Sequence, residues 1–555
     1  MKKGRVFDLA ILTTSLAAFS FFALRQLDLP GLYYDEAADA VPAMQLVLGQ
    51  KLELLNQAGL AWGNLTLPIM IMDYVGTVNT YLLVPLFSMF GVSVISLRLL
   101  TILGGLLTIV FSYFVARALF DRTIAAATVI LLAVHPSFVF WSRQGIHVTS
   151  IMTVLSTASL LCLIVWRRSG RQRFLYLAAF LLGLGLSAKL LFLWFIVALA
   201  ATTFVLFGIP KMARHLRIWG KRDVTADNRN HFPFSPFPLF PLLRLAGCIL
   251  SFVLGAWMIL LYNLLTSGTI TVLTKNLVTT GYGVNNFAFW TNLLTSLDGF
   301  RVFLQGENFW YLGGLFANDW YPTAFVVSAI GSLVVLIHPL ARRHWRSLLF
   351  PPAIIAIIVI QSCFTVSGLW PTHDYITYPF PQMTLAAFAL TTIRLLPLKK
   401  LAPALLIAAL LLMVARDSYV NQEYHRVLAK TGGLFTHSDA IYRLSTYLDS
   451  RGVAEPMAMD WGIKSSVQIL TMGRINPIEI FQYDQDPGPL FFDWLYGALT
   501  TRPDTLYIFH ADDNEIFPRY QAFESLARKL DKKVTLEQTV LQKDRSPIYT
   551  VYSAR

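Results

Sequence analysis

Long apolar runs recur along this chain, separated by short polar segments. After a first run at residues 7–24, the others lie near residues 98–116, 123–141, 150–166, 174–188, 190–208, 245–265, 321–340, 348–368, 375–393 and 401–415. Runs of this length are typical of helices that cross a bilayer, where the backbone must satisfy its own polar groups. With 55% hydrophobic and 14% charged residues, the chain is expected to be a polytopic α-helical membrane protein with about eleven transmembrane helices.

Basic residues indicate which loops face the cytoplasm, because Lys and Arg collect in short cytoplasmic loops. If all basic clusters share one side, an even number of crossings must separate each cluster from the next, and the runs above satisfy this. The clusters are Arg117 with Arg122, Arg167 to Arg173, Lys211 to Arg244, Arg342 to Arg346, and Arg394 with Lys399 and Lys400. We therefore expect a cytoplasmic N-terminus. The net charge of +13 reflects this topology, so no nucleic-acid partner is implied.

One further apolar run, at residues 81–95, does not fit this parity. It is short and interrupted by Pro85 and Gly91, and counting it as a span would place Arg167 to Arg173 outside. We expect a juxtamembrane or re-entrant helix within a first external loop at 28–97. The alternative is an ordinary span with a compensating error elsewhere.

The chain changes character after residue 415. Most of its acidic residues fall beyond that point, and no run there is long enough to span a bilayer. Helix-like and strand-like segments alternate at 438–448, 454–459, 505–509, 520–530, 533–541 and 547–552. We expect a transmembrane domain at 1–415, with a long external loop at 266–320, and a small α/β domain at 416–555. An odd number of spans places this second domain outside the cytoplasm.

The same topology collects polar residues at the external ends of the spans. The candidates for a site are Asp35, Glu36 and Asp73 in the first external loop, with Arg143, Lys189, His373 and Tyr375 in later loops. A carboxylate near a membrane surface can serve as a general base, a metal ligand or the partner of a cation. Arginine, lysine and histidine can hold a phosphate, so the set suits transfer from a phosphate leaving group.

Several motifs carry a family resemblance. They are Leu32–Ala37 (LYYDEA), Tyr74–Gly76, Tyr81–Gly91, Ser96–Arg98, Ala116–Arg122, Pro136–Arg143 and Leu182–Lys189. In this order they resemble the C-type, polyprenyl-phosphate-dependent glycosyltransferases, in the superfamily of protein mannosyltransferases and the aminoarabinose transferase. The resemblance covers roughly residues 5–200, and 365–393 loosely through His373 and Tyr375.

The resemblance implies a fold and a reaction. The fold would be the GT-C membrane fold, and a monosaccharide, hexose or pentose, would pass with inversion from a polyprenyl-phosphate carrier to a hydroxyl of an extracytoplasmic protein, lipid or glycan. Asp35 would be the base or, with Glu36, a ligand of Mg²⁺ or Mn²⁺. The Glu-Lys-Pro-Pro run of the aminoarabinose transferases is missing near Asp73, so Lys189 is the better-placed lysine. The setting implied is the inner membrane of a bacterium, with the active site outside the cytoplasm.

Three alternatives remain open from the sequence. A lipid or glycan transporter or flippase would carry charges at mid-membrane depth and show internal symmetry, whereas here the charges cluster at one face and no clear repeat is found. An enzyme resembling the O-antigen ligases would rely on external arginine and histidine rather than on an early aspartate. A non-catalytic assembly scaffold would lose nothing on replacement of Asp35.

Overall fold

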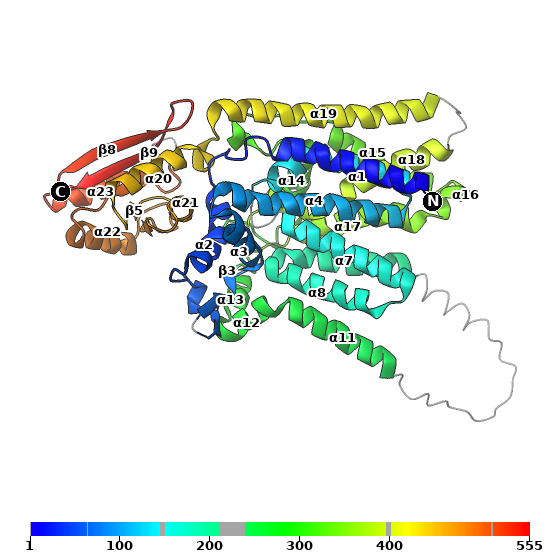
Figure 1. The fold of residues 1–555 in the computed structure, drawn as a ribbon, viewed down its shortest axis with the longest axis horizontal. Coiled ribbons are helices and arrows are strands. Elements are labelled where there is room, and N and C mark those ends of the chain that lie inside the picture. Colours follow the sequence, from blue (N-terminus) through cyan, green and yellow to red (C-terminus); the bar gives the residue numbers. More distant parts are fainter. Residues whose placement is uncertain (1, 64, 145–149, 210–238, 396–400, 512–513) are drawn as a thin grey trace.

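The structure is a computed structural model that describes residues 2–63, 65–144, 150–209, 239–395, 401–511 and 514–555. Most of the basic stretch from Lys211 to Arg244, with Lys399 and Lys400, falls outside these residues. In Figure 1 the long helices run alongside one another, with the N-terminus at one end of the bundle and the strands of the carboxy-terminal part beyond the other end. The protein is thus a helical membrane bundle with a small sheet region at one end.

Each expected span coincides with a helix. The unbroken ones are α1 Lys2–Ala23, α4 Val94–Leu119, α7 Ser150–Ser169, α8 Gln172–Ala188, α9 Leu193–Thr203, α15 Trp320–Val335, α17 Trp345–Ser362, α18 Phe380–Leu395 and α19 Leu401–Thr431. The short turns η2 Leu190–Phe192 and η3 Phe204–Gly208 extend α9 at its two ends. Within the described residues, six helices are long and apolar enough to cross a membrane.

Two further spans are bent. Helix α5 Arg122–Val134 meets α6 Pro136–Ser142 at 61°, and the pair α11 Leu239–Gly255 and α12 Trp257–Thr266 meets at 69°. Pro136 stands at the first position of α6, where its missing N–H costs no hydrogen bond but where the preceding helix must stop. Counting each pair as one span raises the six to eight.

The first external loop folds over one end of the bundle. It contains α2 Tyr34–Leu48, two small hairpins (β1 Gly59–Trp62 with β2 Leu65–Pro68, and β3 Met70–Met72 with β4 Val75–Gly76) and α3 Val78–Phe90. Helix α3 has 13 residues, fewer than the roughly 20 that span a bilayer. It packs between α2 and α4, so the apolar run at 81–95 forms the juxtamembrane helix expected from the sequence.

Two further segments expected to be external connect the later spans, one of them the long loop at 266–320. Between α12 and α15 the chain forms α13 Gly268–Lys275, α14 Phe289–Gln305 and the turn η4 Trp310–Leu312, and between α17 and α18 it forms η5 Pro371–Thr377. Helix α14 lies in the loop that the sequence analysis left without structure. The ring of Phe303 on α14 packs on the ring of Tyr378, with the ring centres 4.9 Å apart, and this contact joins the loop to the bundle.

The carboxy-terminal part is a five-stranded sheet with the order β6-β5-β7-β9-β8. Strands β5 Met457–Ala458, β6 Ile478–Glu479 and β7 Tyr507–His510 are parallel, and β8 Val534–Leu541 with β9 Pro547–Ala554 closes the sheet as an antiparallel hairpin. The helices are α20 Ala440–Arg451, α21 Lys464–Leu470, α22 Pro489–Thr501 and α23 Tyr520–Lys529.

The sheet region docks on the first external loop. Helix α21 packs against α2, the Ser466 hydroxyl donates to the carbonyl of Leu32 at 3.0 Å, and the Tyr442 hydroxyl donates to the carbonyl of Asp28 at 2.6 Å. The first external loop is therefore held between the helix bundle and the sheet, and its core residues join those of the sheet in one apolar cluster.

Candidate functional site

Asp35 and Glu36 stand in the first turn of α2. Tyr33 before them has an extended backbone and makes no side-chain cap. Negative charge is favoured at the start of a helix, where the partial positive charge of the backbone lies. The local sequence therefore places two carboxylates at the start of α2, and their different surroundings give them different roles.

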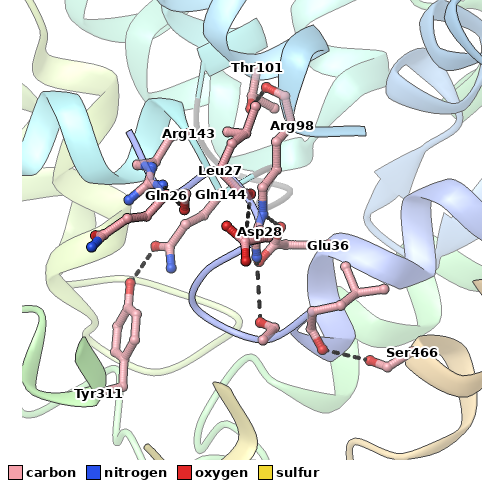
Figure 2. A network of polar contacts seen from close by, with 12 residues as sticks. Gln26, Leu27, Asp28, Glu36, Arg98, Thr101, Arg143, Gln144, Tyr311 and Ser466 are labelled. Atoms are coloured by element: carbon pink, nitrogen blue, oxygen red, sulfur yellow. Dashed lines mark hydrogen bonds and ion pairs between the residues drawn. The ribbon is translucent and has the colours of Figure 1, made fainter. Parts of the chain in front are cut away.

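Glu36 forms a buried ion pair with Arg98 from α4. The Arg98 Nε and Nη2 donate to the two carboxylate oxygens of Glu36 at 2.8 and 3.0 Å, and neither side chain is exposed. Arg98 also donates to the carbonyls of Leu27 and Gly31, which shapes the chain before α2 (Figure 2). With both oxygens engaged, Glu36 holds the loop in place, and this geometry does not fit the expected part in catalysis or metal binding.

Arg143 is also used for structure. It follows α6, is fully buried, and donates from Nη2 to the carbonyls of Arg25 and Gln26 at 2.6 Å each. Burial lowers the pKa of its guanidinium. Next to it, the Gln144 amide oxygen accepts from the Tyr311 hydroxyl at 2.5 Å (Figure 2). Through Nη2 Arg143 fixes the chain after α1, while its buried Nε and Nη1 have no hydrogen-bond partner among the described residues. A phosphate contact through Arg143 stays a prediction.

Lys189 lies close enough to Asp35 for the charge of that carboxylate to act on it. It occupies the turn between α8 and η2, where the backbone N–H of Leu190 donates to the carbonyl of Tyr74 at 2.9 Å. Gly76 makes this approach possible, because a Cβ there would lie 2.1 Å from the carbonyl oxygen of Ser187. The Lys189 ammonium stands 5.7 Å from the centre of the Tyr74 ring. The first external loop and the α8–η2 turn thus meet through their backbones.

The pKa values of Lys189 and His373 depend on burial and on neighbouring charges. Burial lowers the pKa of the Lys189 ammonium to about 8, and the carboxylates of Asp35 and Asp39 oppose that fall. Burial, followed by the charge of Lys189, lowers the pKa of His373 to about 3, so its ring is neutral at neutral pH. Asp35, Lys189 and His373, three residues that are far apart in the sequence, therefore share one electrostatic neighbourhood.

The other predicted residues have partners of their own. Asp73 accepts hydrogen bonds from the Tyr262 hydroxyl and from Asn56, which tie the loop to α12. Tyr375 is fully buried in the bundle, and its hydroxyl lies 2.5 Å from that of Ser142. These contacts place Asp73 against α12 and Tyr375 inside the helix bundle, and neither is joined to Asp35 by the contacts described.

Tyrosines surround Asp35. Burial, followed by the negative charge of Asp35, raises the pKa of Tyr33, and Asp35 also contributes to the raised pKa of Tyr74 and of Tyr483 after burial and nearer groups. Tyr34 packs on Trp461 with ring centres 4.9 Å apart. We call this aromatic group (Tyr33, Tyr34, Tyr74, Trp461 and Tyr483) the aromatic wall. It was not predicted from the sequence, where its only signal is the frequency of tyrosine in segments expected to be external.

His437 stacks on a ring of this aromatic wall and on a ring from another loop. Its ring is stacked between Tyr33 and Tyr311, each with its centre 3.9 Å away. Burial lowers the pKa of His437 to about 3, so it packs as a neutral ring. This stack joins the first external loop, the loop before α15 and the segment that leads into the sheet region.

Metal ligands were also expected at Asp35 and Glu36. Among the residues that the structure describes, no group of three or more His, Cys, Asp or Glu side chains is placed to hold a metal ion, and both oxygens of Glu36 are bound to Arg98. A Mg²⁺ or Mn²⁺ site does not fit this arrangement, and no chemical step below passes through one.

The helical membrane bundle with its juxtamembrane loop and small sheet region has counterparts among known proteins. A family profile described as dolichyl-phosphate-mannose-protein mannosyltransferase matches residues 76–219. No curated protein matches the sequence significantly.

Solved structures agree on the fold. ArnT from Cupriavidus metallidurans bound to undecaprenyl phosphate superposes with a TM-score of 0.58 at 12% identity, over 99% of this chain and 98% of that one. Its apo form gives 0.60 at the same identity and coverage. Archaeal AglB from Archaeoglobus fulgidus, in complex with an inhibitory peptide and a dolichol-phosphate, gives 0.50 at 14% identity, over 91% and 70%. These similarities confirm the expected GT-C fold.

Proposed function

We propose that this protein is a membrane glycosyltransferase that moves a monosaccharide from a polyprenyl-phosphate carrier to an acceptor hydroxyl. The observation that carries the proposal is the position of Lys189: its ammonium stands 5.7 Å from the centre of the Tyr74 ring in the first external loop, and its charge interacts with Asp35 and with the neutral His373. The GT-C fold supports it, as do the lipid phosphates bound in ArnT and AglB. The sugar, hexose or pentose, is a question for the donor panel below.

The proposed reaction divides its charges between these groups. Asp35 accepts the proton of the acceptor hydroxyl while that oxygen attacks the anomeric carbon, and the bond from this carbon to the phosphate oxygen breaks with inversion. The departing lipid phosphate gains negative charge, which the Lys189 ammonium stabilises, and His373 offers it a neutral N–H. The start of α2 favours the ionised form of Asp35, which a base requires.

The sheet region supplies the acceptor side in this proposal. Strands β5, β6 and β7 are parallel, and ligands commonly bind at the carboxyl ends of parallel strands. Trp461 follows β5 and contacts Tyr34, while Tyr483 follows β6 and senses the charge of Asp35. Glu479 at the end of β6 has one buried carboxylate oxygen without a hydrogen-bond partner in the described part of the chain. These groups would recognise the acceptor and position its hydroxyl.

The proposed orientation keeps the N-terminus in the cytoplasm and the site outside it, in the inner membrane of a bacterium. It is supported by the arginines at the other end of the bundle. Arg117 and Arg122 pair there with Asp8 near the N-terminus, and Arg394 pairs with Asp121. Positive loops at the end away from Asp35 are what the positive-inside rule requires.

The test is sugar release from synthetic polyprenyl-phosphate sugars, hexosyl and pentosyl, by purified wild type and by Asp35→Asn. Loss of a general base costs about 10²–10⁴-fold in rate. We expect a loss of that size, with unchanged binding of polyprenyl phosphate. Asp298→Asn is the matched control, because Asp298 is exposed on α14 and pairs only with Arg301 in the described structure. Equal turnover by wild type and Asp35→Asn would remove Asp35 from the mechanism.

A further inference from the structure

A cavity lies at the end of the bundle opposite to Asp35 and Lys189. Its volume is about 700 Å³, within the range of about 300–1,000 Å³ typical of ligand pockets. Helices α7, α8 and α9 and the turn η3 form its walls, with apolar side chains such as Leu182, Ile196 and Leu199. Lys189 directly precedes the span Leu190–Gly208, and Gly208 at the far end of that span lines this cavity. The cavity and the candidate site therefore lie at opposite ends of the span.

Two arginines border the cavity and share one aromatic ring. The guanidinium carbons of Arg167 and Arg346 stand 4.8 and 5.1 Å from the centre of the Phe207 ring. Contacts of this kind contribute only about 0.5–1 kcal/mol at exposed sites and leave the positive charge in place. The ring therefore gathers two cations beside an apolar space.

The carboxylates that the structure describes at this end of the bundle pair with other arginines. Asp8 pairs with Arg117 and Arg122, and Asp121 pairs with Arg394. Within the described ranges, Arg167 and Arg346 form no ion pair with a carboxylate, and the buried Nε of Arg346 has no hydrogen-bond partner. An anion with hydrogen-bond acceptors would complete this arrangement.

The backbone of the cavity wall is also unusual. Residues Phe204–Gly208 form a turn of π-helix, a rare form that is frequent at functional sites. It contributes Phe204, Phe207 and Gly208 to the lining, next to the two arginines. A short widened turn here brings two aromatic rings to the same wall.

We propose that this cavity binds an anionic glycerophospholipid, with an acyl chain in the apolar space and the phosphate between Arg167 and Arg346. Basic pockets between transmembrane helices on the cytoplasmic side commonly bind the head groups of anionic lipids. Charge complementarity and the apolar lining both select such a lipid over a soluble phosphate. The site is independent of the proposed sugar transfer, because it lies at the other end of the spans.

The test is lipid retention by the full-length protein, measured by native mass spectrometry after exchange into phosphatidylglycerol or phosphatidylcholine. We expect the wild type to retain phosphatidylglycerol at least tenfold better than phosphatidylcholine. The double variant Arg167→Gln with Arg346→Gln should lose this preference. Arg171→Gln with Arg343→Gln removes the same charge from exposed neighbouring positions and should keep it.

A second variant tests the apolar part without touching the arginines. Ala200→Phe fills the cavity that Ala200 lines, and we expect it to retain less phosphatidylglycerol while its melting temperature stays near that of the wild type. Equal retention of both lipids by the wild type, or an unchanged preference in the Arg167 and Arg346 double variant, would overturn the proposal. Displacement of phosphatidylglycerol by equimolar undecaprenyl phosphate would overturn it too, by assigning the cavity to the carrier lipid.

Discussion

Lys189 is the residue through which pH should act on the candidate site. Its pKa of about 8 means that the ammonium loses its proton as the pH rises through 8, and with it the attraction for a phosphate. We expect the dissociation constant of polyprenyl phosphate to be steady below pH 7 and to rise about tenfold per pH unit above 8. Direct binding measurements between pH 6 and 10 would show this.

Lys189→Arg provides the control for this pH dependence. A guanidinium stays charged throughout that range, so the rise above pH 8 should vanish in the variant. His373, with its pKa of about 3, should add no step between pH 5 and 8. A wild-type affinity that does not change between pH 7 and 9.5 would contradict the role given to Lys189.

Arg98 and Glu36 should matter for stability rather than for chemistry. Arg98→Met leaves the Glu36 carboxylate buried and unpaired, which costs about 3–5 kcal/mol of unfolding free energy. Replacing both partners, Arg98→Met with Glu36→Leu, should recover a large part of that loss, because no charge is then left buried. Unfolding titrations of the purified protein in detergent measure both values. A double variant as unstable as the single one would show that the pair does more than neutralise itself.

Gly76 acts at the scale of elements, where strand β4 meets the end of α8. A methyl group at this position would overlap the carbonyl oxygen of Ser187, and backbone cannot move away as a side-chain tip can. We expect Gly76→Ala to cost about 1–3 kcal/mol in stability and to weaken lipid-phosphate binding by displacing Lys189 from the loop. Gly281→Ala, where an added Cβ meets nothing within 4 Å, should change neither quantity.

The sequence was informative about elements wherever length and hydrophobicity decide the outcome. All the apolar runs became helices because hydrocarbon forces the backbone to bond within its own segment. The bends at 61° and 69° were not predicted, since a proline or small residue marks where a helix can break and packing decides the angle. Strand β6 was missed because two residues are too few to show an alternating pattern.

For the proposed site, Asp35, Lys189 and His373 stay predictions made from their position in the chain, whereas the structure shows partners for the other candidates. Glu36, Arg143 and Asp73 are polar residues in external loops like the others. Only the fold shows that Glu36 pairs with Arg98, that Arg143 donates to carbonyls after α1, and that Asp73 accepts from Tyr262. The sequence contained Arg98 within a recognised motif, but nothing in one sequence indicates which carboxylate it meets.

At the scale of the whole molecule, His437 connects the sheet region to the loop that carries Asp35. We expect His437→Ala to slow sugar transfer about tenfold, since each aromatic pair contributes about 0.5–1.5 kcal/mol and two are lost. His437→Phe keeps the stack and should keep the rate, because the ring is neutral at pH 7. Loss of activity in both variants would point to a chemical role for the imidazole. Tyr496→Ala on α22 is the exposed aromatic control.

The first external loop lies between the helix bundle and the sheet. These two parts of the protein are translated at different times. Asp35 is translated among the first residues of the chain, while Tyr311, His437, Trp461 and Tyr483 follow hundreds of residues later. In the proposed orientation, the carboxylate reaches the outer face of the membrane during synthesis with only its neighbours in the chain, such as Tyr33 and Tyr34, beside it. The surroundings that complete the site arrive only with the last quarter of the chain, which ties the onset of activity to the export and folding of the sheet.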